Sequence, residues 1–243
     1  MADPVGSAEI NLDALRHNLA AIRSRTPVKI AAIVKANAYG HGILPVSRTL
    51  IEAGADLLGV AQLSEALELR SHEPDIPILT WIYAPGADLE AGFRAGLEIS
   101  VGAPWAIGEV LDAARRFGGT ARIHIEVDTG MSRGGFAPGD IAEAGTMLAR
   151  AVSQGLVEIA GLWSHLARAD EPQCGETERQ LDRFNAITKE LKDLGIDPEA
   201  RHLANSAGTF WHPDTHLDMV RPGIALYGIS PEPAIATAAE LGL

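Results

Sequence analysis

The sequence predicts an α/β protein folded as a closed (β/α)8 barrel, or TIM barrel, and three observations lead to this prediction. Apolar, β-branched segments alternate with amphipathic helical segments along the chain, and eight of them have the composition of strands. No Gly-x-Gly-x-x-Gly turn follows the first strand, which disfavours an open dinucleotide-binding sheet. Closure also removes the two edges that an open sheet must protect. A chain of 243 residues suits one such barrel, so we expect a single domain.

The predicted elements follow one another in a regular order. An opening helix carries apolar residues on one face, namely Leu12, Leu15, Leu19 and Ile22. The strand segments are residues 28–34, 56–61, 76–82, 96–101, 121–127, 156–163, 200–204 and 217–221. Helical segments lie between them at 43–53, 63–72, 87–94, 105–117, 139–153 and 176–194, and we expect short helices in the two remaining gaps.

Composition and charge exclude several classes of function. The chain has 20 basic and 32 acidic residues and a formal net charge of −12, so no basic face is expected for nucleic acid or an acidic membrane. Its single cysteine, Cys174, forms neither an internal disulfide nor a multi-cysteine metal site, which suits a reducing compartment. No apolar run reaches the roughly 18 residues of a membrane helix. We therefore expect a cytoplasmic protein without a metal site.

Lys35 is the first candidate functional residue, because catalytic residues of TIM barrels follow the strands. It comes directly after seven mostly apolar residues, which would partly desolvate its amine. Desolvation favours the neutral, nucleophilic amine that forms an imine with an aldehyde. The alternative is an ordinary lysine at a strand end whose amine extends into solvent.

The fifth and sixth strands are followed by further polar residues. Glu126, Asp128 and Arg133 follow the fifth strand, and the glycines beside Arg133 allow close approach of the backbone to a ligand while the guanidinium makes planar contacts. Alternatively, Asp128 and Arg133 form a salt bridge within the loop. The sixth strand leads to His165, and a histidine in such a position is by itself more often a hydrogen-bonded core residue than a catalytic one.

The last two strands predict a phosphate site. In TIM barrels the loops after strands seven and eight often bind phosphate, and here Ser206 and the amides of Gly223 and Ile224 would form that site. A short helix after Asn205 would add free amides. The alternative is that Ser206 only caps this helix. Together with Lys35, a phosphate site indicates a phosphorylated aldehyde as the ligand.

Six segments resemble, in the same order, the motifs of alanine racemases. They are VKANAYGHG (34–42), GVAQLSEALELR (59–70), VDTGMSRGG (127–135), GLWSHLARAD (161–170), HLANSA (202–207) and MVRPGIALYG (219–228). They cover essentially the whole chain, which thus resembles the N-terminal barrel of this family. The resemblance implies a fold type III enzyme that uses pyridoxal 5'-phosphate (PLP) to racemise alanine and supplies D-alanine for peptidoglycan.

The resemblance also implies roles for individual residues. Lys35 would carry PLP through an imine and act as the base on the α-proton of D-alanine. Arg133 would bind near the phenolic oxygen of PLP or the substrate carboxylate, and Arg221 would face the pyridine nitrogen, with His165 hydrogen-bonded to Arg221. The remaining residues would bind the cofactor, mainly its phosphate: Tyr39, Asn205, Ser206, Gly223 and Ile224.

An arginine beside the pyridine nitrogen has a chemical consequence. Because Arg221 stays protonated and only donates hydrogen bonds, the ring nitrogen next to it stays unprotonated. The electron sink is then weaker, which favours return of the proton over transamination or decarboxylation. Related decarboxylases place a carboxylate there, so Arg221 favours racemisation.

Two features depart from the family pattern. Glu126 stands where many members have a lysine that is often carbamylated, and we expect its own carboxylate to pair with Arg133. Family members also continue into a β-rich domain that supplies a tyrosine base to the partner subunit of a homodimer, whereas this sequence stops at Leu243. Tyr83 and Tyr227 have no acid or base role in the motifs.

Four readings therefore stay open. The chain is an alanine racemase barrel that lacks the C-terminal domain, a racemase of another amino acid, a non-catalytic PLP-binding carrier, or a fragment that neither folds nor holds PLP.

Overall fold

The computed structural model describes residues 6–73 and 75–243, and its strands form one parallel sheet in the order β7-β6-β5-β4-β3-β2-β1-β8. The strands are β1 (Lys29–Ile33), β2 (Leu57–Gln62), β3 (Ile78–Ile82), β4 (Glu98–Val101), β5 (Ala121–Glu126), β6 (Val157–Trp163), β7 (Arg201–His202) and β8 (Met219–Val220). Two backbone hydrogen bonds close the circle between β8 and β7: Asp218 N donates to Arg201 O (3.0 Å) and Arg221 N to Ala204 O (2.8 Å). The predicted TIM barrel is confirmed.

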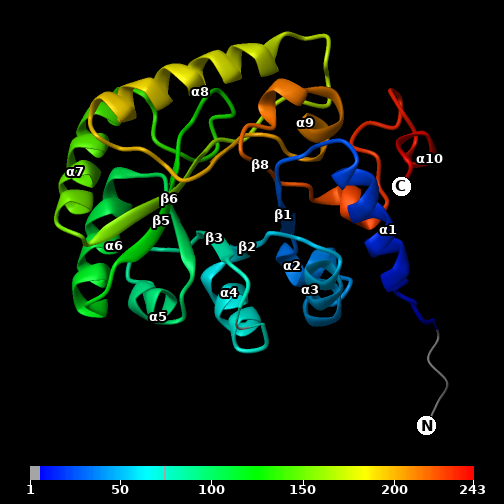
Figure 1. The fold of residues 1–243 in the computed structure, drawn as a ribbon, viewed down its shortest axis with the longest axis horizontal. Helices are drawn as coiled ribbons and strands as arrows, with labels where there is room; N and C mark the ends of the chain where they lie inside the picture. The colour runs from blue at the N-terminus through cyan, green and yellow to red at the C-terminus, as the bar shows by residue number, and fades with distance from the viewer. Residues whose placement is uncertain (1–5, 74) are drawn as a thin grey trace.

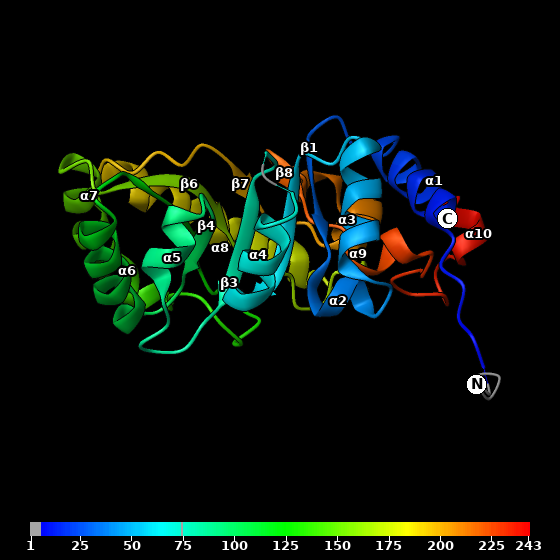
Figure 2. The ribbon, with the colours of Figure 1, turned by 90° about the horizontal axis from the view of Figure 1, so that it is seen from below.

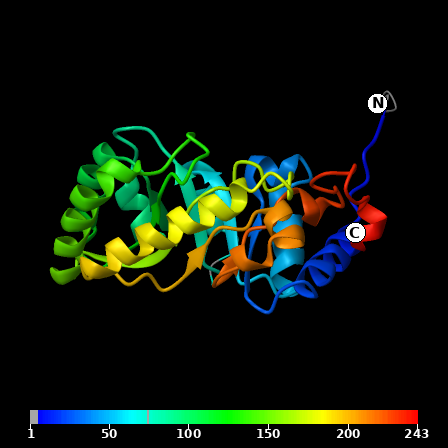
Figure 3. The same ribbon diagram turned by 90° about the horizontal axis from the view of Figure 1, so that it is seen from above.

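Helices surround the strands in a ring (Figure 1). They are α3 (Ile43–Glu52), α4 (Leu63–Arg70), α5 (Leu89–Arg94), α6 (Pro104–Phe117), α7 (Ile141–Ser153), α8 (Glu176–Asp193) and α9 (Ser206–Trp211). Figure 2 shows α3 to α6 side by side, and Figure 3 shows α8 and α9 on the opposite side of the barrel. Each predicted helical segment is confirmed, with ends that differ by a few residues. In the described part of the chain, none of these helices is both long and apolar enough to cross a membrane.

The two ends of the chain complete the ring. Helix α1 (Leu12–Arg23) packs against α3 and against a 3₁₀ turn at Ile224–Tyr227, where Asn18 donates to Leu226 O (3.0 Å). The short helix α10 (Ala238–Leu241) lies beside α1 in Figures 1 to 3, with a hydrogen bond between His17 Nε2 and Gly242 O (3.0 Å). Residues before β1 and after β8 thus cover the last side of the barrel together.

Local signals explain where the long helices begin and end. The side chain of Asn11 accepts hydrogen bonds from the amides of Asp13 and Ala14 and so caps α1. Helix α6 begins with Pro104, whose missing N–H is no loss in the first turn, and ends at Gly118, whose φ of 73° suits glycine. These residue types set the helix boundaries that the sequence predicts.

The last two strands are shorter than predicted. Residues 200–204 and 217–221 were expected to be strands, but only Arg201–His202 and Met219–Val220 join the ladder. Ala204 N donates to Thr215 O instead of to a strand, and Pro222 has no N–H to donate. The chain therefore leaves the sheet early at the positions where the site is built.

The inside of the barrel is divided between apolar and polar side chains. Where β8, β1, β2 and β3 meet, the interior is filled by an apolar cluster of Ala31, Leu57, Leu79 and Met219. On β5, by contrast, Arg122, His124 and Glu126 alternate with apolar residues and so point to one face, because side chains of a strand repeat every second residue. The polar half of the interior leads up to the candidate site.

The segment after β1 is a left-handed turn that the sequence does not predict. Helix α2 (Lys35–Tyr39) contains four consecutive non-glycine residues with φ near +55°, from Ala36 to Tyr39. Each costs about 1–2 kcal/mol relative to a right-handed conformation. The turn is held by tertiary hydrogen bonds, since Asn37 Oδ1 accepts from Ile43 N (2.8 Å) and Glu65 Oε1 accepts from Ala36 N (2.6 Å). Strain of this kind is concentrated at functional sites.

Candidate active site

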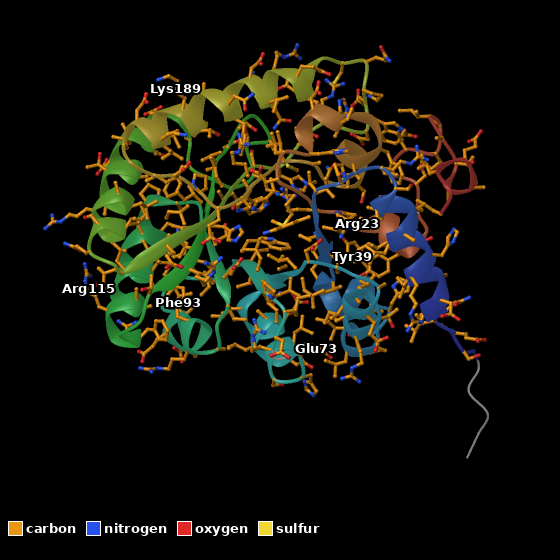
Figure 4. The ribbon with its side chains drawn as sticks, in the orientation of Figure 1. Arg23, Tyr39, Glu73, Phe93, Arg115 and Lys189 are labelled. Carbon is orange, nitrogen blue, oxygen red and sulfur yellow. The ribbon has the colours of Figure 1, made fainter. Side chains whose placement is uncertain are left out.

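A cavity of about 640 Å³ opens at the carboxyl ends of the strands. It is lined by all ten candidate residues, which are Lys35, Tyr39, Glu126, Arg133, His165, Asn205, Ser206, Arg221, Gly223 and Ile224. In Figure 4, Tyr39 lies inside the ring of helices, whereas Arg115 and Lys189 point outward. Residues from five different strand ends thus meet in one cavity, as expected of a TIM barrel site.

Lys35 is half-buried in the wall of this cavity. Burial and the positive charge of Arg133 lower the pKa of Lys35, while Glu65 opposes this shift. The ammonium nitrogen lies 5.8 Å from the centre of the Tyr39 ring. The left-handed turn of α2 therefore brings Lys35 and Tyr39 to the same space, and Lys35 is not a lysine that extends into bulk solvent.

Hydroxyl groups gather at the end of the cavity formed by the last two strands. Ser206 Oγ accepts hydrogen bonds from the amides of Gly223 (2.9 Å) and Ala225 (3.4 Å). A side chain at Gly223 would place its Cβ only 2.5 Å from Tyr39 Oη, so glycine is required for this approach. Among the described residues, no acceptor is found for the hydroxyl hydrogens of Tyr39 and Ser206, which remain available to a ligand.

The alternative that Ser206 only caps α9 is wrong. The cap of α9 is Asn205, whose side chain accepts from Gly208 N (2.9 Å), and not Ser206. The second amide that donates to Ser206 Oγ belongs to Ala225, two residues after Gly223. The 3₁₀ turn after Gly223 directs the later amide toward the hydroxyl.

Arg133 lies in a loop whose shape is set by Asp128. Asp128 Oδ1 accepts from the amides of Gly130 (2.8 Å) and Ser132 (3.1 Å), so the carboxylate holds the loop and does not pair with Arg133. Arg133 is exposed and has no ion pair or hydrogen bond within residues 6–73 and 75–243. Its guanidinium is therefore available to an anionic ligand.

The expected pairing of Glu126 with Arg133 is wrong as well. The two side chains form no ion pair within 4.0 Å, although both line the described cavity. Burial raises the pKa of Glu126 to about 7, against the opposing influence of Arg133 and Arg221. Near neutral pH, Glu126 is thus divided between its acid and its carboxylate, because burial outweighs the attraction of cations that it does not touch.

Arg221 is buried after β8 and is held by many acceptors. Its Nη1 donates to His202 Nδ1 (3.1 Å) and His202 O (2.8 Å), and its Nη2 donates to Ser164 O (2.7 Å) and Leu203 O (3.3 Å). Within the described chain, Nε–H is the guanidinium donor that has no partner. Burial lowers the pKa of Arg221 to about 9, which still leaves it protonated at neutral pH. One directed donor therefore remains for a ligand.

The sequence suggested a hydrogen bond between His165 and Arg221, and this prediction is wrong. The histidine that contacts Arg221 is His202. His202 lies on β7, next to the position of Arg221, while His165 follows β6 and lines the cavity. Burial, together with Arg221, Arg133 and Lys35, lowers the pKa of His165 to about 3, so its imidazole is neutral at neutral pH.

Sequence reasoning missed the residues that support this site. The side chain of Gln180 donates to Thr129 Oγ1 (2.9 Å) and His165 O (3.0 Å), while Thr129 Oγ1 is 2.8 Å from Ser164 Oγ. The guanidinium of Arg221 lies over the ring of Trp163, 4.9 Å from its centre. A polar residue on an otherwise apolar helix face, such as Gln180, is the signal that would have indicated this network. No metal-binding group of side chains is found among the described residues.

The fold and the cavity define the class of this protein. It is a TIM barrel with a ligand site at the carboxyl ends of its strands, built between a lysine after the first strand and an arginine after the eighth. The family model described as alanine racemase, N-terminal domain, matches residues 10–231. The chain therefore belongs to the alanine racemase N-terminal domain family.

Individual relatives agree with this assignment. The alanine racemase of Streptomyces coelicolor is 47% identical over 243 residues, which covers 97% of this chain and 62% of the relative. The crystal structure of alanine racemase from D-cycloserine producing Streptomyces lavendulae matches with a TM-score of 0.94 and 45% identity, over 96% of this chain and 62% of that one. The alanine racemase of Bartonella henselae, solved with covalently bound pyridoxal phosphate, matches with a TM-score of 0.83 and 28% identity, over 94% and 62%. The chain thus spans less than two thirds of the length of these relatives.

Proposed function

We propose that this chain forms the PLP-binding barrel of an alanine racemase and that Lys35 is both the attachment point of the cofactor and the base for the α-proton of D-alanine. The observation that carries this proposal is the convergence of Lys35, Ser206, Tyr39 and the free Nε–H of Arg221 on one cavity. The family membership of the chain and the bound cofactor of the Bartonella relative support it.

The donor set of the cavity fits PLP. A phosphate needs several donors, and the hydroxyls of Tyr39 and Ser206 lie together beside the closely approaching backbone of Gly223. An aldehyde needs a neutral amine, and burial lowers the pKa of Lys35. A pyridine nitrogen accepts one hydrogen bond, and the Nε–H of Arg221 is the donor left for it.

When bound, PLP would delocalise the electron pair that remains on Cα after the α-proton is removed. Lys35 would take that proton and return it. Arg221 stays protonated at neutral pH, because its pKa of about 9 lies above that pH, and a protonated guanidinium donates hydrogen bonds without accepting any, which favours proton return over other fates of the amino acid. Arg133, which has no protein partner in the described chain, would bind the carboxylate of alanine.

A second candidate function rests on the tyrosines. Racemisation needs a base on each face of the substrate, yet the hydroxyls of Tyr83 and Tyr227 donate to Ser100 O (2.9 Å) and Ile33 O (3.1 Å). Burial raises the pKa of both. The described residues therefore offer Lys35 as one base and no comparable tyrosine opposite it, which favours a PLP-binding barrel that exchanges a proton on one face.

Exchange of the α-proton in heavy water distinguishes these functions. The protein with added PLP is incubated separately with D- and L-alanine, and exchange and inversion are followed by NMR and chiral analysis. We expect exchange of D-alanine that depends on Lys35. Lys35→Ala should abolish it, and Lys29→Ala, at the other end of β1, should not. If both enantiomers exchange and invert, a second base is present. If no PLP absorbance that depends on Lys35 is observed, the proposal is contradicted.

We also propose four properties that the sequence leads us to expect. They are alanine as the preferred substrate, a cytoplasmic location, the folding of these 243 residues as one domain and the homodimer typical of family members. Exchange assays with other small amino acids test the first, and analytical ultracentrifugation tests the last.

A further inference from the structure

A line of four buried side chains crosses the inside of the barrel. Arg221 Nη1 is 3.1 Å from His202 Nδ1, His202 Nε2 is 2.9 Å from His124 Nδ1, and His124 Nε2 is 2.7 Å from Glu98 Oε2. None of the four is more than 6% exposed. Arg221 follows β8 at the cavity, whereas Glu98 is the first residue of β4, so the line connects the two ends of the barrel.

The direction of every hydrogen bond in this line follows from its ends. Arg221 only donates, so His202 Nδ1 must accept and His202 must carry its proton on Nε2. That N–H donates to His124 Nδ1, so His124 must carry its proton on Nε2 as well. The Nε2–H group of His124 then donates to the Glu98 carboxylate. Both imidazoles are therefore neutral Nε2–H tautomers, and no other assignment satisfies all three contacts.

Glu98 is fixed as the anionic end of the line by an outer contact. Its Oε1 accepts from Arg122 Nε (3.0 Å), which is also held by Glu199. Although burial raises the pKa of Glu98, the hydrogen bonds from His124 and Arg122 lower it below its ordinary value. Burial and Arg221 lower the pKa of His202 well below its ordinary value. These directions agree with an ionised carboxylate and a neutral imidazole.

The backbone of β6 makes room for the contact between the two histidines. A Cβ at Gly161 would lie 2.2 Å from His124 Nδ1 and 2.9 Å from His202 Nε2, which leaves no space for any side chain there. A register shift between β5 and β6 pairs Gly161 with His124. The irregularity and the glycine together admit the central hydrogen bond of the line.

We propose that Glu98 and His124 are positioning residues for Arg221, which act through His202 to balance its charge and hold its guanidinium with Nε–H toward the cavity. The arrangement of the four side chains stands on the structure alone, while its use in catalysis rests on the proposed function. Neither Glu98 nor His124 contacts the cavity.

The first test needs no cofactor. Protein labelled with ¹⁵N in histidine is examined by NMR at neutral pH, where the nitrogen shifts report the tautomer of each ring. We expect His124 and His202 as neutral Nε2–H forms, with both N–H protons protected from exchange. An Nδ1–H tautomer or a doubly protonated ring at either position overturns the proposal, whatever the result of the alanine exchange assay.

The second test separates the line from the outer ion pairs. Glu98→Gln removes the charge at the end of the line, and Glu199→Gln removes a charge that contacts Arg122 but not His124. We expect the His124 N–H signal to shift or disappear only in Glu98→Gln. The same variant should bind PLP about tenfold more weakly. In the loaded enzyme, kcat should fall at unchanged KM for alanine, because Arg133 is untouched. Equal behaviour of the two variants overturns the proposal.

A third comparison uses the glycines and covers the case in which Glu98→Gln does not fold. Gly161→Ala places a methyl group between the imidazoles, whereas Gly108→Ala, in α6, meets no atom within 4 Å. We expect the His124 and His202 signals and the PLP affinity to change only in Gly161→Ala. Unchanged signals in Gly161→Ala contradict the proposed contact.

Discussion

Replacing Glu126 with glutamine should remove a pH-dependent part of the stability of this protein. The carboxyl group of Glu126 is largely buried and has no ion pair among the described residues, and burial raises its pKa from 4.5 to about 7. Between these pH values the folded protein holds a proton that the unfolded chain has released. The contribution of Glu126 is therefore fully present below pH 4.5 and is lost as the pH rises through about 7.

The size of this change in stability follows from the difference between the two pKa values. At about 1.4 kcal/mol for each tenfold change in proton affinity, the interval from 4.5 to about 7 corresponds to about 3 kcal/mol of unfolding free energy. Glutamine does not titrate. The difference in stability between Glu126→Gln and the unmodified protein should thus grow by about 3 kcal/mol, in favour of the variant, between pH 4.5 and pH 8.

Urea unfolding, followed by circular dichroism at several pH values, measures this difference. His165, with its pKa lowered to about 3, also changes stability with pH, but it is present in both proteins and cancels. Glu199→Gln is the control for the sign, because hydrogen bonds to Arg122 lower the pKa of Glu199 and its contribution is lost at low pH. A difference for Glu126→Gln that is constant with pH, or that favours the unmodified protein at pH 8, refutes the reasoning.

Three further substitutions test the cavity and the core. Ser206→Ala removes the hydroxyl that accepts hydrogen bonds from two backbone amides. We expect PLP, titrated by absorbance, to bind about tenfold more weakly, whereas the affinity for pyridoxal, which has no phosphate, should be unchanged. Gly223→Ala brings a Cβ within 2.5 Å of Tyr39 Oη and should weaken PLP at least as much; full affinity would exclude the close approach. Leu58→Ala, at a fully buried position, should lower the unfolding free energy by about 3 kcal/mol in urea without changing PLP affinity, and a loss below about 1 kcal/mol would show that the site repacks. As a control, Gly108→Ala should leave both properties intact or add slightly to stability.

Local pattern was sufficient for most of the fold. The 3.6-residue spacing of Leu181, Phe184, Ile187 and Leu191 predicts α8, and the apolar run before Lys35 predicts β1, because period and composition act over neighbouring residues. The candidate site residues were also found, since the ends of parallel strands meet at one face of a barrel.

The left-handed turn of α2 lay beyond such reasoning. Nothing in Ala36 to Tyr39 favours positive φ, and Asn37 is the residue among them that tolerates it best. The turn exists because Asn37 Oδ1 accepts a hydrogen bond from Ile43 N at the start of α3. In addition, the ring of Tyr39 packs against the ring of Tyr227, with 4.8 Å between ring centres. These partners lie elsewhere in the chain, so tertiary contacts outweigh the local preference.

By itself, the sequence determined the TIM barrel, the family and ten of the residues that line the cavity, because hydrophobic period and strand ends are local properties. Only the tertiary structure decided which residues touch. Arg221 forms a hydrogen bond with His202 and not with His165, and Glu126 has no ion pair within the described residues although Arg133 lines the same cavity. Chain order brings all of these side chains to one end of the barrel, but a hydrogen bond depends on ångström distances, and strand register, bulges and turns set those distances.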